Sequence, residues 1–145
     1  MLGLGLVKSD NKAAKIYRRA VELGDVEAMT NLAVLHDRGG SGVNHDKKKA
    51  ERLYRAAADR GDAVAQTNLG GLLHFEGKPE EAFRFFALAA DQGFAEGENN
   101  LGVCYRDGDG TEVDLGKARY WLERAAAKGH ELAIRALADL DDARV

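Results

Sequence analysis

The chain has 145 residues, of which 45% are hydrophobic, so it is long and apolar enough to form one domain with a buried core. Lys and Arg number 21 against 24 Asp and Glu, a balance that excludes a strongly basic nucleic-acid-binding surface. No apolar run approaches the roughly 18 residues of a membrane span, and a single cysteine excludes an intramolecular disulfide. We therefore expect one cytoplasmic domain over residues 1–145, with no nucleic-acid or membrane partner.

One phrase of twelve residues occurs four times along the chain. Its copies read LGDVEAMTNLAV, RGDAVAQTNLGG, QGFAEGENNLGV and KGHELAIRALAD. The second residue of each copy is a glycine, and a leucine follows eight positions later. The four glycines are Gly24, Gly61, Gly93 and Gly129. They stand 32 to 37 residues apart, which is the length of a two-helix repeat unit.

Apolar residues recur at helical spacing on both sides of each repeated glycine. In chain order, helices are predicted over residues 11–23, 26–38, 47–60, 63–75, 79–92, 95–107, 115–128 and 131–143. We name the helix that follows each glycine a first helix. The helix that leads into each glycine is named a second helix.

The joint between a second helix and the next first helix is very short. Its glycine is expected to take the left-handed conformation, which satisfies carbonyl groups left open at a helix end. Asp25 and Asp62 follow two of the glycines, where the N-cap of the next helix belongs. So short a joint forces its two helices to be antiparallel. The pattern predicts an all-α fold, a right-handed α-solenoid of about four antiparallel pairs and eight helices.

The loop before each second helix carries a glycine pair in three of the four copies. These pairs are Gly3 with Gly5, Gly40 with Gly42, and Gly108 with Gly110. In the remaining copy the loop is shorter, and Pro79 stands near the first helical position, where its missing N–H costs nothing. The last loop resembles a calcium loop, but Ala118 stands at the twelfth position, where a carboxylate is required. We therefore expect no metal there, and Asp114 as a helix N-cap.

Residues 99–130 carry the most specific motif of the chain. The matching positions are Leu101, Gly102, Tyr105, Gly108, Gly110, Lys117, Ala118, Trp121, Ala125, Ala126 and Gly129. This register resembles the Sel-one-like repeat (SLR) family, which is related to the tetratricopeptide repeats. The resemblance covers about residues 3–143, although the unit around Asn68 has a short loop and is closer to an ordinary tetratricopeptide unit.

The resemblance implies a non-enzymatic protein-interaction scaffold whose first helices line a concave groove. The groove positions that it implies are Asn31, Asn68, Asn100, Glu27, Glu96, Thr30, Thr67, Asn99 and Val34, with Val64, Gly71 and Val103 nearby. A column of asparagine amides could bond along an extended peptide backbone. The alternative interpretation is that asparagine tolerates a half-exposed position or bonds to the adjacent helix.

The charged residues near these asparagines indicate which charge a bound peptide would carry. Some tetratricopeptide domains hold C-terminal carboxylates through flanking lysine or arginine, whereas Glu27, Val64 and Glu96 stand at those positions here. A carboxylate clamp is therefore not expected. Glu27 and Glu96 instead favour a basic peptide, although exposed charges are individually weak.

The sequence is compatible with two alternative functions. The first is a structural domain that docks or self-associates through an open N-terminal edge around Ile16 and Tyr17, because the chain begins with a second helix and is compatible with a fragment of a longer array. The second, more distant, is a hydrolase, but no nucleophile motif is present. Cys104 is expected to be a buried thiol. No catalytic residue, metal or cofactor is predicted, and the partner is an unidentified protein or peptide.

Overall fold

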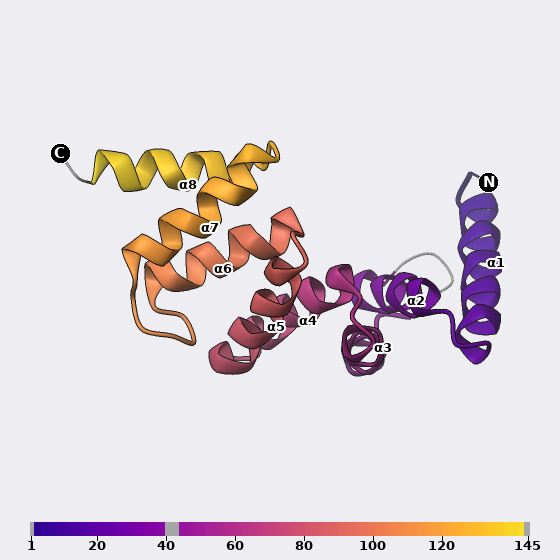
Figure 1. The fold of residues 1–145 in the computed structure, drawn as a ribbon. Helices are drawn as coiled ribbons and strands as arrows, with labels where there is room; N and C mark the ends of the chain where they lie inside the picture. The colour runs from indigo at the N-terminus through magenta and orange to yellow at the C-terminus, as the bar shows by residue number, and fades with distance from the viewer. Residues whose placement is uncertain (1, 40–43, 144–145) are drawn as a thin grey trace. The chain divides into compact units, whose positions relative to one another are not determined.

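The computed structural model describes residues 2–39 and 44–143, with side chains from residue 12 onward, and all of its regular elements are α-helices (Figure 1). They are α1 (Leu2–Glu22), α2 (Val26–Arg38), α3 (Lys47–Asp59), α4 (Ala63–Phe75), α5 (Pro79–Asp91), α6 (Ala95–Asp107), α7 (Leu115–Ala127) and α8 (Glu131–Asp142). The predicted all-α architecture of eight helices is confirmed. The chain divides into two compact units, residues 1–65 and 66–145. In the described residues, no helix combines the length and the apolar character that a membrane crossing requires.

The predicted bounds hold to within one residue for every helix except the first. We expected that helix to begin near Asn11, after a loop containing Gly3 and Gly5, but α1 begins at Leu2 and includes both glycines. This prediction was wrong because a glycine inside a helix costs only about 1 kcal/mol relative to alanine, which does not by itself end the helix. Gly40 and Gly42 lie outside the described residues. Gly108 and Gly110 do lie in a loop, with φ of 74° and 73°.

The joints have the predicted geometry. At the first joint Gly24 has φ of 84°, and the N–H groups of Gly24 and Asp25 bond back to the carbonyls of Val21 and Ala20. The Asp25 carboxylate then accepts from the Ala28 N–H at 2.9 Å, which makes Asp25 the N-cap of α2. The joint at Gly61 repeats the pattern with φ of 91°. These local bonds turn the chain between α1 and α2 within three residues, and the two helices pack against each other.

In the first unit, α2 packs against both α1 and α3. The core between α1 and α2 is formed by Ala14 and Leu32, with partly buried apolar residues around them. Those residues are Tyr17, Val21, Leu35 and Leu53. Both neighbours of α2 are its neighbours in sequence, as expected for a helical repeat.

In the second unit, α6 packs between α5 and α7, and α7 packs against α8 (Figure 1). Two of the first helices carry a leucine–glycine pair on the face that meets the following second helix. A Cβ on Gly70 would lie 2.5 Å from the Phe86 ring, and one on Gly102 would lie 2.7 Å from Leu122. The glycine of each pair therefore allows the two helices of a repeat to approach closely.

Candidate functional site

The predicted groove positions divide into surface and interior residues. The amides of Asn31, Asn68 and Asn100 are half-buried, and the carboxylates of Glu27 and Glu96 are exposed. By contrast Thr30, Thr67 and Asn99 are only 4%, 3% and 5% exposed, so their side chains pack inside the repeats. The remaining predicted residue, Val34, is half-buried on α2.

The interior position on α2 has a clear structural task. The hydroxyl of Thr30 donates a hydrogen bond to Asp62 Oδ2 at 2.9 Å. The same Asp62 oxygen accepts from the Ala65 N–H at 2.9 Å, which makes Asp62 the N-cap of α4, as predicted. Thr30 therefore ties α2 to the joint between α3 and α4.

A hollow of about 260 Å³ lies in the first unit, between α1 and α2. Asn31, Glu27 and the N-cap Asp25 form its polar part. Its apolar part includes Ile16 and Tyr17, the two residues predicted to form an open N-terminal edge. The structure thus brings together a groove asparagine, two carboxylates and the proposed edge in one concave surface.

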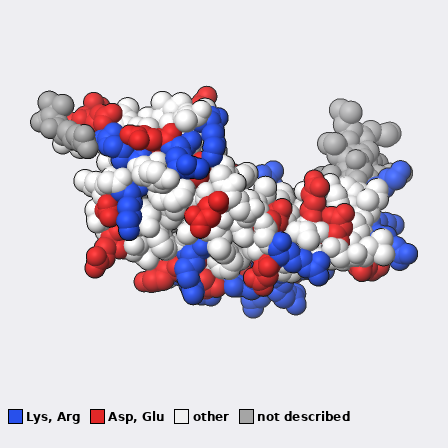
Figure 2. Space-filling view, viewed as in Figure 1, with Lys and Arg blue, Asp and Glu red and all other residues white. Residues whose placement is uncertain are grey.

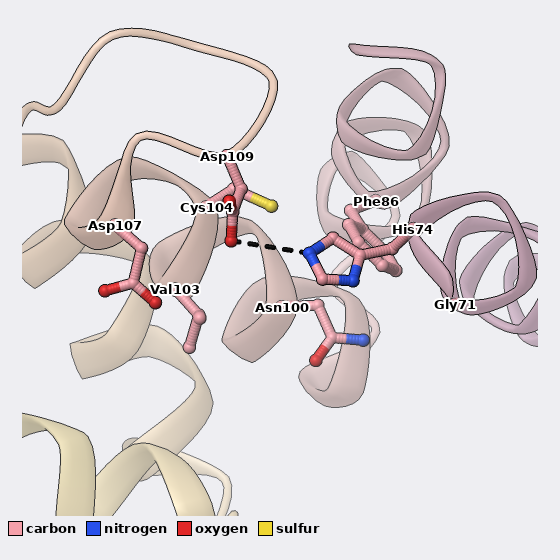
Figure 3. A pocket seen from close by; sticks show the side chains of 8 residues that line it. All are labelled: Gly71, His74, Phe86, Asn100, Val103, Cys104, Asp107 and Asp109. Carbon is pink, nitrogen blue, oxygen red and sulfur yellow. Dashed lines mark hydrogen bonds and ion pairs between the residues drawn. The ribbon is translucent and has the colours of Figure 1, made fainter. Parts of the chain in front are cut away.

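A hollow of about 350 Å³ lies in the second unit (Figure 3). It is lined by Gly71, His74, Phe86, Asn100, Val103, Cys104, Asp107 and Asp109. The Asn100 amide is therefore beside a cavity, as Asn31 is in the other unit. Asn68 borders neither hollow. His74 and Asp109 are cavity residues that sequence reasoning did not select, because they come from segments 35 residues apart.

Two carboxylates of this cavity have different surroundings. Asp109 faces His74 across the cavity, with 3.4 Å between Asp109 Oδ2 and His74 Nε2 (Figure 3). Asp107 instead accepts two hydrogen bonds from Arg106, at 2.8 and 3.0 Å. The Arg106 guanidinium lowers the pKa of Asp107 through these bonds, so Asp107 remains ionised at neutral pH.

The cavity does not supply an activated nucleophile. Cys104 is buried, as predicted, and this burial, together with Asp109 and Asp107, raises its thiol pKa to about 12. A thiol with this pKa is protonated at neutral pH and is therefore inert. Asp114, from the loop that resembles a calcium site, accepts from the Lys117 N–H at 3.0 Å and caps α7, as predicted. In residues 2–39 and 44–143 no group of three or more metal-binding side chains is found.

A third hollow, of about 320 Å³, lies between α6 and α8. Asn99 lines it, and the Oδ1 atom of Asn99 is buried without a hydrogen-bond partner among the described residues. Arg106, Arg135 and Asp139 provide its charged groups. Because the lining carries both positive and negative groups, it indicates neither an anionic nor a cationic ligand.

Sequence reasoning also missed a buried ion pair. Glu98 is fully buried, and its carboxylate accepts from Arg124 at 2.9 Å and from Lys128 at 2.6 Å. Lys128 also donates to the Gly93 carbonyl at 2.7 Å, just as Arg60 donates to the Gly24 carbonyl at 3.1 Å. The sequence signal for these contacts is a basic residue directly before the joint glycine, which is Arg60 before Gly61 and Lys128 before Gly129. Its role is structural, because it ties each of these joints to the preceding one.

The surface charge is mixed. Figure 2 shows Lys and Arg side chains interspersed with Asp and Glu over the visible face, without a broad patch of either sign. This distribution agrees with the near balance of charges in the sequence. On this face, no broad charged patch would therefore select a partner by its charge.

The chain resembles known repeat proteins over most of its length. The family model of the Sel1 repeat matches residues 1–25, 26–62, 63–94 and 95–130. A protective antigen of uropathogenic Escherichia coli with an SLR fold is 32% identical with a TM-score of 0.82. The match covers 91% of this chain and 30% of the antigen chain. A Sel1 repeat protein from Oxalobacter formigenes is 30% identical with a TM-score of 0.78. The match covers 89% of this chain and 54% of the Oxalobacter chain. The chain thus spans less than two thirds of these solved structures. No curated protein matches.

Proposed function

Because the chain belongs to the Sel1 repeat family, whose helical solenoids are typically non-enzymatic scaffolds for protein interactions, we propose that it binds a peptide segment of a partner protein on its first helices. The single observation that carries this proposal is the position of the asparagines. Asn31 and Asn100 occupy equivalent repeat positions, and each borders a hollow of several hundred Å³. In each unit, the binding surface would therefore include a half-buried amide beside a hollow with apolar and polar parts.

The chemistry of an amide suits a ligand that is a peptide backbone. Asparagine offers a carbonyl acceptor and two N–H donors, so it can bond to a backbone N–H and C=O without selecting the side chain. The neighbouring hollows would then select the side chains. This division of tasks gives affinity through the backbone and specificity through the pockets.

A variant series tests this proposal. Peptides selected by phage display against the full chain would be titrated by calorimetry into the wild type and into the triple variant Asn31→Ala, Asn68→Ala, Asn100→Ala. We expect a loss of affinity of about tenfold or more, because each lost amide bond is worth about 1 kcal/mol. Asn44→Ala is the matched control, since that asparagine lies in an exposed loop and its contact with His36 is made by the backbone carbonyl, which the substitution keeps. Unchanged affinity in the triple variant would rule out the amide column.

One observation also supports a second candidate, self-association through the N-terminal edge. Ile16 is 58% exposed on α1 and borders the hollow that contains Asn31. An exposed apolar side chain beside a concavity could receive a second copy of the chain. Multi-angle light scattering over a range of concentrations separates the candidates. A mass that stays monomeric at all concentrations would contradict self-association and leave peptide binding.

A further inference from the structure

One of the residues that line the cavity beside Asn100 has no side chain. Gly71 stands ten residues after its joint glycine, where the equivalent residues of two other repeats are Val34 and Val103. A Cβ placed on Gly71 would meet nothing within 4 Å. A valine at this position would therefore project into the open cavity. The glycine therefore adds open space to this cavity, although the third hollow, which has Val103 at the equivalent position, also reaches about 320 Å³.

The lining of the cavity is apolar on one side and acidic on the other. Phe86 and Val103 provide apolar surface, and Phe86 is nearly fully buried. Asp107 and Asp109 provide carboxylates, and the lining contains no lysine or arginine. Arginine and lysine have this same division, with an apolar stem and a charged end. Ligand sites in proteins typically have volumes of about 300–1,000 Å³. The volume of this cavity, about 350 Å³, is near the lower end of that range, so it suits a side chain better than a large cofactor.

The hydrogen-bonding groups favour a ligand that donates. The Asp109 carboxylate is 41% exposed, and its contact with His74 is long, at 3.4 Å. It can therefore accept further hydrogen bonds, while Asp107 is already held by Arg106. The Asn100 carbonyl accepts one bond from Asn99, also at 3.4 Å, and has a second lone pair. A guanidinium carries five N–H donors in a planar fork and matches such separated oxygen acceptors.

We propose that this cavity is a specificity pocket for an arginine side chain of the bound peptide, with Asp109 and Asn100 receiving the guanidinium. The inference rests on the proposed peptide-binding function and names the side chain that the second unit selects. The stem of the arginine packs against Phe86 and Val103. The backbone of the peptide then lies at the mouth of the pocket.

The test uses two short peptides that differ only in charge. Acetyl-Gly-Gly-Arg-Gly-Gly-amide and its citrulline counterpart have nearly the same shape, but citrulline is neutral. Each is titrated into the ¹⁵N-labelled full chain and followed by amide chemical shifts. We expect the arginine peptide to bind in the millimolar range and to shift the amides of residues 71, 74 and 109. The citrulline peptide should bind at least about fivefold more weakly, because a hydrogen bond to a charged group is the stronger kind.

Two variants locate the binding. Gly71→Leu should abolish the shifts, because its side chain fills the cavity without meeting other atoms at the Cβ. Asp109→Asn should weaken binding by about tenfold through loss of the charged acceptor. Glu112→Gln is the matched control, since it removes an exposed carboxylate from the same loop without touching the cavity. A thermal melt of Gly71→Leu close to that of the wild type excludes unfolding as the cause.

The outcomes separate this inference from the function on which it rests. No shifts at millimolar peptide, equal binding of the citrulline peptide, or full binding by Gly71→Leu would each overturn the arginine pocket. If the phage-selected peptides still lose affinity in the triple asparagine variant, the peptide-binding proposal stands without this pocket. If those peptides are unaffected but the arginine peptide binds as expected, the pocket stands and the amide column fails.

Discussion

The adjacent glycines Gly70 and Gly71 of α4 differ in the space that an added Cβ atom would find. Gly70 faces Phe86 so closely that a Cβ would lie 2.5 Å from its ring, whereas a Cβ on Gly71 would point into open space. Gly70 therefore serves the packing of the repeat. Gly71 instead leaves the pocket open.

This difference predicts opposite effects of the same substitution. Gly70→Ala should lower the free energy of unfolding by about 1–3 kcal/mol, because the Phe86 ring must move in a close-packed core. Gly71→Ala should raise it by about 0.5–1 kcal/mol, because alanine loses less backbone entropy than glycine in a helix. Chemical denaturation of the two variants measures both values. A loss of stability of equal size in both would show that the pair is not distinguished by packing.

At the scale of elements, the joints explain why so many bounds could be predicted. Each end of a first or second helix depends on residues within a few positions, such as Gly61 and the cap Asp62. Repetition adds cross-links between successive joints, as when Arg60 reaches the Gly24 carbonyl. The joint is thus both the local stop of one helix and a contact to the preceding repeat.

The joint at Gly61 allows backbone strain to be measured alone. Its φ of 91° is unfavourable for a side chain, yet an added Cβ would meet nothing within 4 Å. Gly61→Val should therefore destabilise the protein by about 1–2 kcal/mol or more, through left-handed strain at a β-branched residue. Gly61→Asn is the control, because asparagine tolerates this conformation better and should cost less. Thermal melts identical to the wild type for the valine variant would contradict the argument.

At the scale of the whole molecule, packing between neighbouring helices should make stability depend on local interfaces. α8 packs mainly on α7, around a core of Leu122, Ala125, Ala133 and Ala136. In such repeats, stability is approximately a sum of repeat and nearest-neighbour terms. The α8 end should therefore affect α7 strongly and more distant helices weakly.

Removing residues 131–145 tests this expectation. The truncation exposes Leu122 and Ala125, so the free energy of unfolding should fall by about 2–4 kcal/mol. Far-UV circular dichroism should lose little more helix than α8 itself contributes. Complete loss of helical signal would show that the molecule unfolds as one cooperative body, against the neighbour-only account.

Local sequence patterns were sufficient for the helices, the joints and the family resemblance. Left-handed glycines, aspartate caps and helical spacing act over a few residues, so they can be identified without coordinates. The start of α1 was missed because Gly3 and Gly5 are tolerated inside a helix, and no local rule excluded that outcome.

Which candidate site residues are buried and which border a hollow depends on residues far apart in the chain. Thr30 and Asn31 are adjacent in sequence, but one is buried against Asp62 and the other borders a hollow. Likewise, Gly71 borders a cavity only because Phe86 of α5 and Asp109 of the loop after α6 lie around it. Exposure and pocket shape arise from packing between helices, and a short sequence pattern carries no record of which side chains come together.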